Sequence, residues 1–160
     1  MHKQKSYRAL ILCCGRMDRG DDAIGPLCAD ALQDRKIPSR TLRGDTSELL
    51  DAWHTAQHII MVDAIVTGQS PPGTLYCVES RDERFRAEAA RCSSTGLGLV
   101  QAMKLAPMLK CMPSSMLLIG LEAANFEWAS TLSQPVAAAM PQLIDTIEHE
   151  WHKLVTSPVR

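Results

Sequence analysis

The chain has 160 residues, of which 46% are hydrophobic and 22% are charged, a composition that suits a single globular domain. Its formal net charge is -1, so it lacks the basic excess that favours binding to nucleic acid or to an anionic membrane surface. The longest apolar runs have about six residues, far fewer than the ~20 of a membrane-spanning helix. Residues 1–8 are polar and basic, without the apolar core of a signal peptide. We therefore expect a cytoplasmic protein with neither nucleic acid nor a membrane as partner.

The first predicted element is a strand at 7–14, because the residues after Arg8 are continuously apolar, as in a strand covered on both faces. After a loop at 15–22, apolar residues at positions i, i+3, i+4, i+7 and i+8 predict an amphipathic helix from Ile24 to about Lys36. A short strand at 41–43 and a helix capped by Ser47 are expected to follow.

The middle of the chain contains a second predicted central strand, at 59–66, in which Asp63 is the one charged residue. A turn and a strand at 74–78 come next, followed by the charged, solvated stretch 81–91. Ser93 or Ser94 is then expected to cap a helix that turns three apolar side chains inward. These side chains are Leu97, Val100 and Met103.

The last predicted elements are an apolar strand at 116–121 and a long helix capped by Ser133, with Pro135 in its first turn. Strands thus alternate with helices along the chain. This order predicts one α/β domain over residues 1–160, with three layers: a twisted, mostly parallel sheet of about five strands and helices on both faces.

Carboxylates follow or end several predicted strands, where open α/β sheets bind ligands. Asp21 and Asp22 follow the first strand, Asp63 lies near the end of the strand at 59–66, and Glu122 follows the last strand. Burying a carboxylate costs several kcal/mol unless it is paired or binds a cation. Two interpretations therefore remain open for Asp63: a hydrogen-bonded cap of the next loop, or part of a shared cation site or proton-transfer pair.

The glycine-rich loop after the first strand does not match a dinucleotide-binding fingerprint. Gly15, Gly20 and Gly25 are evenly spaced rather than arranged as G-x-G-x-x-G, and the adjacent Asp21 and Asp22 would repel a pyrophosphate. We therefore expect no nucleotide and no other organic cofactor.

The six cysteines include no C-x-x-C pair, which a zinc ribbon or redox motif would need. Cytosolic cysteines of this kind are usually reduced and buried. Of the histidines, His54 and His58 precede the strand at 59–66, at the end opposite the predicted site, and are expected to have surface or capping roles.

Six motifs in this sequence, taken in order and spacing, resemble the hydrogenase maturation endopeptidases over about residues 9–150. The motifs are Arg-Gly-Asp-Asp-Ala-Ile-Gly at 19–25, Val-Asp-Ala at 62–64, Pro-Pro-Gly-Thr-Leu at 71–75, Gly-Leu-Gly-Leu at 96–99, Ile-Gly-Leu-Glu at 119–122 and Leu-Ser-Gln-Pro-Val at 132–136. The resemblance implies a small α/β enzyme. It also implies a substrate, the nickel-loaded large-subunit precursor of a nickel–iron hydrogenase, from which the family removes a C-terminal extension.

The resemblance also assigns site residues. It places the family's two acidic nickel ligands on Asp22 and Asp63, which would also be the catalytic residues, and puts Thr95 where the family usually has a histidine. A hydroxyl is a weaker nickel ligand than imidazole. Cys92 lies close to this position and is an alternative ligand. In the loop after the first strand, Arg16 replaces an asparagine and brings a fixed positive charge near the aspartates.

Two functional hypotheses follow. In the first, the protein is a processing endopeptidase: Asp22 and Asp63 hold the substrate's nickel or another divalent ion, and Thr95 assists through a hydrogen bond or a bridging water. In the second, it is a non-catalytic or metal-independent relative with a binding or chaperone-like role, in which Arg16 and the aspartates form a structural ion pair. The absent histidine favours the second hypothesis, and the retained aspartates and turns favour the first.

Overall fold

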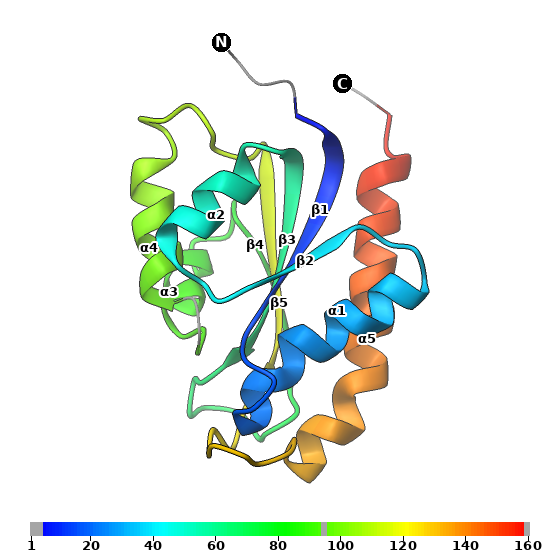
Figure 1. Ribbon diagram of the computed structural model, residues 1–160. Helices are drawn as coiled ribbons and strands as arrows, with labels where there is room; N and C mark the ends of the chain where they lie inside the picture. The colour runs from blue at the N-terminus through cyan, green and yellow to red at the C-terminus, as the bar shows by residue number, and fades with distance from the viewer. Residues whose placement is uncertain (1–4, 94–95, 159–160) are drawn as a thin grey trace.

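The computed structural model describes residues 5–93 and 96–158 and shows one α/β domain, in which a five-stranded sheet lies between two layers of helices (Figure 1). The strands are β1 (Tyr7–Cys14), β2 (Ser39–Leu42), β3 (Ala56–Ile65), β4 (Leu75–Glu79) and β5 (Ser115–Glu122). The helices are the short 3-10 turn η1 (Gly20–Ala23), α1 (Ile24–Asp34), α2 (Thr46–Trp53), α3 (Phe85–Ala90), α4 (Gly96–Leu105) and α5 (Gln134–Thr156). The predicted fold class is confirmed.

The sheet has the strand order β2-β1-β3-β5-β4. The first four strands in this order run parallel, and β4 pairs antiparallel with β5 at one edge. The carboxyl ends of the parallel strands therefore lie together, at the lower end of the molecule in Figure 1, whereas the described chain begins and ends at the opposite end. This lower end is where a doubly covered parallel sheet offers a ligand site.

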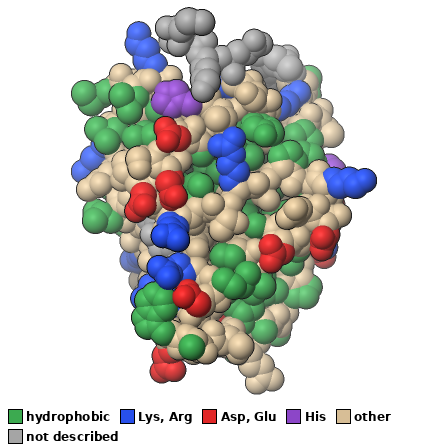
Figure 2. Space-filling model, in the orientation of Figure 1, with side chains coloured by type: hydrophobic (Ala, Val, Ile, Leu, Met, Phe, Trp, Pro, Cys, Tyr) green, Lys and Arg blue, Asp and Glu red, His purple; other side chains and the backbone are tan. Residues whose placement is uncertain are grey.

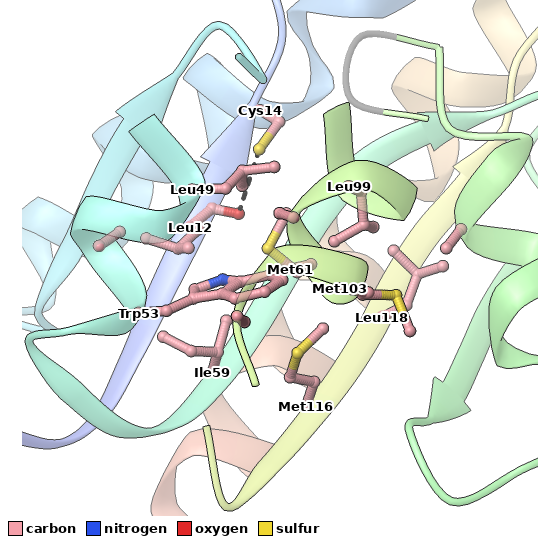
Figure 3. Packing of buried hydrophobic residues seen from close by; sticks show 14 of the residues in the cluster. Leu12, Cys14, Leu49, Trp53, Ile59, Met61, Leu99, Met103, Met116 and Leu118 are labelled. Carbon is pink, nitrogen blue, oxygen red and sulfur yellow. Dashed lines mark hydrogen bonds between the residues drawn. The ribbon is translucent and has the colours of Figure 1, made fainter. Parts of the chain in front are cut away.

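Each face of the sheet has its own hydrophobic core. On one face, α2, α3 and α4 cover a cluster that includes Trp53, Met61 and Leu118 (Figure 3). On the other face, α1 and α5 cover a cluster that includes Ile24, Val62 and Ile119. Because side chains alternate along a strand, Met61 and Asp63 lie on the face covered by α2, α3 and α4.

Close contact between backbones fixes the start of α1 against the end of β1. A Cβ atom added to Gly25 would lie 2.1 Å from the carbonyl oxygen of Cys14 and 2.7 Å from its nitrogen. No larger residue fits there without movement of the backbone. Gly25 thereby holds η1, which contains Asp21 and Asp22, directly over the end of the sheet.

Two details of the predicted helices are wrong. Helix α2 begins at Thr46 with Asp45 as its N-cap residue, not Ser47. Leu97, expected to point inward, is 76% exposed. The inward side of α4 at this point is taken by Gly98, where an added Cβ would lie 2.2 Å from the carbonyl oxygen of Gly44. The close approach of two backbones therefore replaces the expected leucine contact.

Across residues 5–93 and 96–158, no helix combines the length and the apolar character needed to cross a membrane.

The contact between Gly25 and Cys14 predicts an unusual response to alanine. In an exposed helix, replacing glycine with alanine stabilises by about 1 kcal/mol, but Gly25→Ala should lower the free energy of unfolding by about 2 kcal/mol because the methyl group overlaps backbone atoms. Urea denaturation measures the difference. Gln142→Ala, at an exposed position of α5, is the control and should change stability by less than about 0.5 kcal/mol. Equal stability of Gly25→Ala and the wild type would contradict this account.

Candidate functional site

Two buried aspartates meet at one serine hydroxyl at the carboxyl ends of β1 and β3. Ser93 Oγ lies 2.8 Å from Asp22 Oδ1 and 3.3 Å from Asp63 Oδ1. Asp22 is 1% exposed and Asp63 is fully buried. The structure thus brings together the two residues that the resemblance assigns to catalysis, although their roles remain a proposal.

Ser93 is positioned by a short extension of the sheet. Its backbone N–H donates to the carbonyl of Ala64 (2.9 Å), and the N–H of Val66 donates to the carbonyl of Arg91 (3.0 Å). An isolated antiparallel bridge between Ile65 and Cys92 lies between these bonds. The segment after α3 is therefore pinned along the end of β3, so that the Ser93 hydroxyl faces Asp63.

Sequence reasoning assigned Ser93 only to a helix cap and missed this role. The contact that places it joins residues that are 30 positions apart in the sequence, so no local sequence pattern predicts it. The other serine considered for that cap, Ser94, and Thr95 lie outside the described residues.

The hydrogen bonds described for the two aspartates come from neutral donors. Asp22 Oδ2 accepts the backbone N–H of Arg16 (3.1 Å), and Asp63 Oδ1 accepts the backbone N–H of Ala64 (2.8 Å). The Ser93 hydroxyl has a single hydrogen, and the shorter distance assigns it to Asp22. Such donors orient the carboxylates, and carboxylate oxygens are suitable ligands for a divalent cation.

Asp21, next to this pair in sequence, has a structural role. Its carboxylate accepts the backbone N–H groups of Ala124 (2.8 Å), Asn125 (3.0 Å) and Ser133 (2.7 Å), together with the Ser133 hydroxyl (2.9 Å). These bonds join η1 to both ends of the loop between β5 and α5. They also explain why Ser133, the N-cap residue of α5, makes no side-chain bond to its own helix.

Glu122 is also engaged with a loop. Its carboxylate accepts the backbone N–H groups of Thr67 (3.1 Å) and Gly68 (2.9 Å), and the Thr67 hydroxyl (2.9 Å). Glu122 thus has the loop-capping role that was one of the two interpretations of Asp63. Of the carboxylates expected at this end of the sheet, Asp22 and Asp63 share a partner, whereas Asp21 and Glu122 each hold a loop.

Arg16 does not form the expected ion pair with the site aspartates. Its Nε lies 3.3 Å from Asp18 Oδ1, and its guanidinium carbon lies 4.8 Å from the centre of the Trp128 ring. Only its backbone N–H binds Asp22. The side chain is directed to the outer side of the loop because Asp18 and Trp128 offer a partner there, so the structural ion pair of the second hypothesis is wrong.

The cysteines near the site are buried thiols. Burial raises the pKa of Cys14 well above its ordinary value, and the carboxylate of Asp63 raises that pKa further. Cys14 is therefore protonated at neutral pH and is neither a nucleophile nor a ready metal ligand. Cys92 is also buried, with its sulfur 3.8 Å from the carbonyl oxygen of Glu88.

Within the described part of the chain, no group of three or more His, Cys, Asp or Glu side chains is arranged to hold a metal ion. Thr95, the third ligand implied by the resemblance, is not among the residues described. His58 lies at the far end of the sheet, where its Nδ1 is 2.8 Å from Ser115 Oγ, as its expected structural role requires.

A groove of about 380 Å³ opens beside Ser93. It lies between the turn at 44–46 and the start of α4, and Cys92, Ser93 and the exposed Leu97 line it. Its floor depends on Gly98, which permits the close approach to Gly44. The groove opens at the surface and is lined by the serine that links the two aspartates.

The hydrogen bonds to Asp21 predict that its removal releases the loop between β5 and α5. Asp21→Ala should lower the free energy of unfolding by about 3 kcal/mol because four donors lose their acceptor. It should also speed hydrogen exchange at the amides of Ala124, Asn125 and Ser133, which amide-resolved exchange measures. The exposed Asp51 provides the control: Asp51→Ala should leave these amides unchanged. Unchanged exchange in Asp21→Ala would contradict the structural role.

Comparisons with known proteins agree with this architecture. A model of the hydrogenase maturation protease family matches residues 44–150, more than half of the chain. The chain is 30% identical to the hydrogenase 2 maturation protease of Escherichia coli K12 over 146 residues, covering 88% of each protein. It is 29% identical to the hydrogenase expression/formation protein HupM of Azotobacter chroococcum over 141 residues, covering 84% of this chain and 67% of that protein.

A solved structure shows the same fold. The hydrogenase maturating endopeptidase HybD from E. coli superposes with a TM-score of 0.76 at 26% identity, over 91% of this chain and 93% of that one. The family model, the curated relatives and the fold agree, and the chain belongs to the hydrogenase maturation protease family.

Proposed function

We propose that the protein is an endopeptidase that removes the C-terminal extension of a nickel–iron hydrogenase large-subunit precursor after nickel insertion. The observation that carries the proposal is the pair of buried carboxylates, Asp22 and Asp63, that one hydroxyl links at the carboxyl ends of the strands. Membership of the hydrogenase maturation protease family supports the reaction class and the substrate class.

In this proposal the nickel belongs to the substrate. Two carboxylates supply too few ligands for a closed structural site, and the described residues add no third His, Cys, Asp or Glu beside them. An incomplete ligand set fits an ion that arrives with ligands from the precursor. With such a site, the protein would cut the peptide bond only in a precursor that already contains nickel.

The two aspartates have complementary roles in the proposed reaction. Asp22 is bonded to Ser93 and to the Arg16 backbone, while Asp63 is held by the Ala64 backbone at the end of β3. Both are therefore fixed in position before substrate binds. One contacts the substrate's metal ion, and the other orients or deprotonates the attacking water. The peptide to be cut lies along the groove beside Ser93.

Thr95 is proposed to occupy the position of the family histidine. A hydroxyl assists there by a hydrogen bond or through a bridging water, and it binds nickel more weakly than an imidazole. The activity would then depend more on Asp22 and Asp63 than it does in relatives that carry the histidine.

The central experiment incubates the protein with a nickel-loaded large-subunit precursor and follows the released C-terminal fragment by mass spectrometry. Wild type should cut the nickel-loaded precursor and leave the nickel-free precursor intact. Asp22→Asn and Asp63→Asn should each lower the cleavage rate by at least about 10²-fold, while Asp51→Asn, an exposed change on α2, should have no effect. The absence of cleavage by wild type, under conditions where a histidine-bearing relative cuts, would overturn the proposal.

Stability separates a catalytic role of Asp63 from a structural one. Asparagine keeps an oxygen acceptor for the Ala64 amide, so Asp63→Asn should change the free energy of unfolding by less than about 1 kcal/mol while activity falls. A loss of several kcal/mol in urea denaturation would instead assign Asp63 to the structure.

The position of Thr95 is tested by adding the imidazole. Thr95→His should strengthen nickel binding, measured by titration calorimetry, because nitrogen is the better donor for a borderline divalent ion. His54→Gln, which removes an imidazole bonded to the Leu50 carbonyl in α2, is the control and should leave nickel affinity unchanged. Unchanged affinity of Thr95→His would show that Thr95 does not stand at the position of the family histidine.

A further inference from the structure

Two arginines and an exposed tryptophan cluster on the outer side of the loop that carries Asp22. Trp128 is 61% exposed, and the guanidinium carbons of Arg16 and Arg19 lie 4.8 Å and 5.5 Å from the centre of its ring. We call these three residues the arginine–tryptophan rim. At the lower left of the face in Figure 2, basic, hydrophobic and acidic side chains lie next to one another. Tryptophan and arginine are enriched among the residues that contribute most to binding at protein interfaces, so this cluster is a candidate binding surface.

The rim is built on a well-ordered pair of loops. The backbone N–H of Ala129 donates to the carbonyl of Asp18 (2.8 Å), and that of Gly20 donates to the carbonyl of Ser130 (3.2 Å). The carboxylate of Asp21 holds both ends of the loop that carries Trp128. The rim is thus fixed in place before any partner binds, which lowers the entropy lost on binding.

The charge of the two arginines is only partly compensated. Arg16 pairs with Asp18, but the two side chains are 46% and 61% exposed, and exposed pairs of this kind contribute about 0–1 kcal/mol. Arg19 donates from Nε to the carbonyl oxygen of Phe126 (3.3 Å), and it makes no ion pair with another residue in the ranges 5–93 and 96–158. Guanidinium groups in this state favour carboxylates, which they bind through paired hydrogen bonds.

The rim and the groove are connected to the aspartates through different residues. The backbone N–H of Arg16 binds Asp22 directly, while the groove opens at Ser93, on the side of α2 and α4. We propose that the arginine–tryptophan rim binds a carboxylate of the precursor, so that the cleaved bond lies between this anchor and the groove. This inference rests on the proposed function and names a specificity determinant for it: an acidic side chain or the terminal carboxylate of the extension.

Binding is tested first, without any cleavage. Three fluorescently labelled peptides of otherwise identical sequence are titrated with the protein: one with glutamates and an amidated C-terminus, one with glutamines and an amidated C-terminus, and one with glutamines and a free C-terminal carboxylate. Preference for the first identifies side-chain carboxylates, and preference for the third identifies the chain terminus. Both preferences should weaken as salt is added. Equal affinity for all three peptides would overturn the inference.

Variants then assign the binding to the rim. The double variant Arg16→Gln, Arg19→Gln should bind the preferred peptide about tenfold more weakly. The matched control is Arg40→Gln, Arg81→Gln, which removes the same charge. Arg40 also lies over an aromatic ring, that of Tyr7 at 5.8 Å, but Tyr7 begins β1 at the other end of the sheet. Equal loss of affinity in both double variants would show that net charge acts, not the rim.

Cleavage of the nickel-loaded precursor provides the second measurement. The rim variant should raise KM about tenfold with kcat unchanged, and replacing the acidic groups of the extension should abolish the difference. An unchanged KM would overturn the inference even if the precursor is cut. If wild type cuts no precursor but the rim still selects carboxylate peptides, the proposed function fails and the carboxylate site stands.

Discussion

Negative charge buried at one end of a hydrophobic sheet is the constraint on which this structure depends. A buried carboxylate needs hydrogen bonds, because the free-energy cost of burying an unpaired charge is comparable to the whole net stability of a domain. Asp21 and Glu122 meet this requirement with backbone amides of two loops, so that the loops are ordered by the charges they surround. Asp22 and Asp63 share the hydroxyl of one serine. The same physical cost therefore orders the loops and holds in place the pair of acids to which the proposed function assigns the reaction.

This division links the fold to the proposed activity. Gly25 fixes the start of α1 on the end of β1 through contact between backbones, and this contact sets the height of Asp22 over the sheet. The bridge between Ile65 and Cys92 places Ser93 beside Asp63. These contacts position both acids and Ser93, so the geometry of the proposed site is built into the scaffold.

Much of the fold follows from local sequence patterns. The strand at 7–14 has the predicted bounds, and the other strands differ by a few residues, because continuous apolar runs identify strands covered on both faces. Asp63 was identified as special for the same reason, since it interrupts such a run. The different roles of Asp21 and Asp22 could not be predicted from the sequence. The two residues have the same side chain, and Asp21 is structural because it binds the distant loop at 124–133.

The errors have a common origin in contacts between distant segments. Leu97 has helical spacing suited to burial, but the glycine beside it approaches the turn at Gly44, and the leucine is left at the surface. Arg16 was expected at the aspartates, yet its side chain packs against Trp128, which is far along the chain.

Burial of both acids also has a consequence for the cell. Under the proposed function, a peptidase whose two reacting acids are buried stays inactive toward other proteins, and only a chain that brings its own metal ion to the groove would be cut.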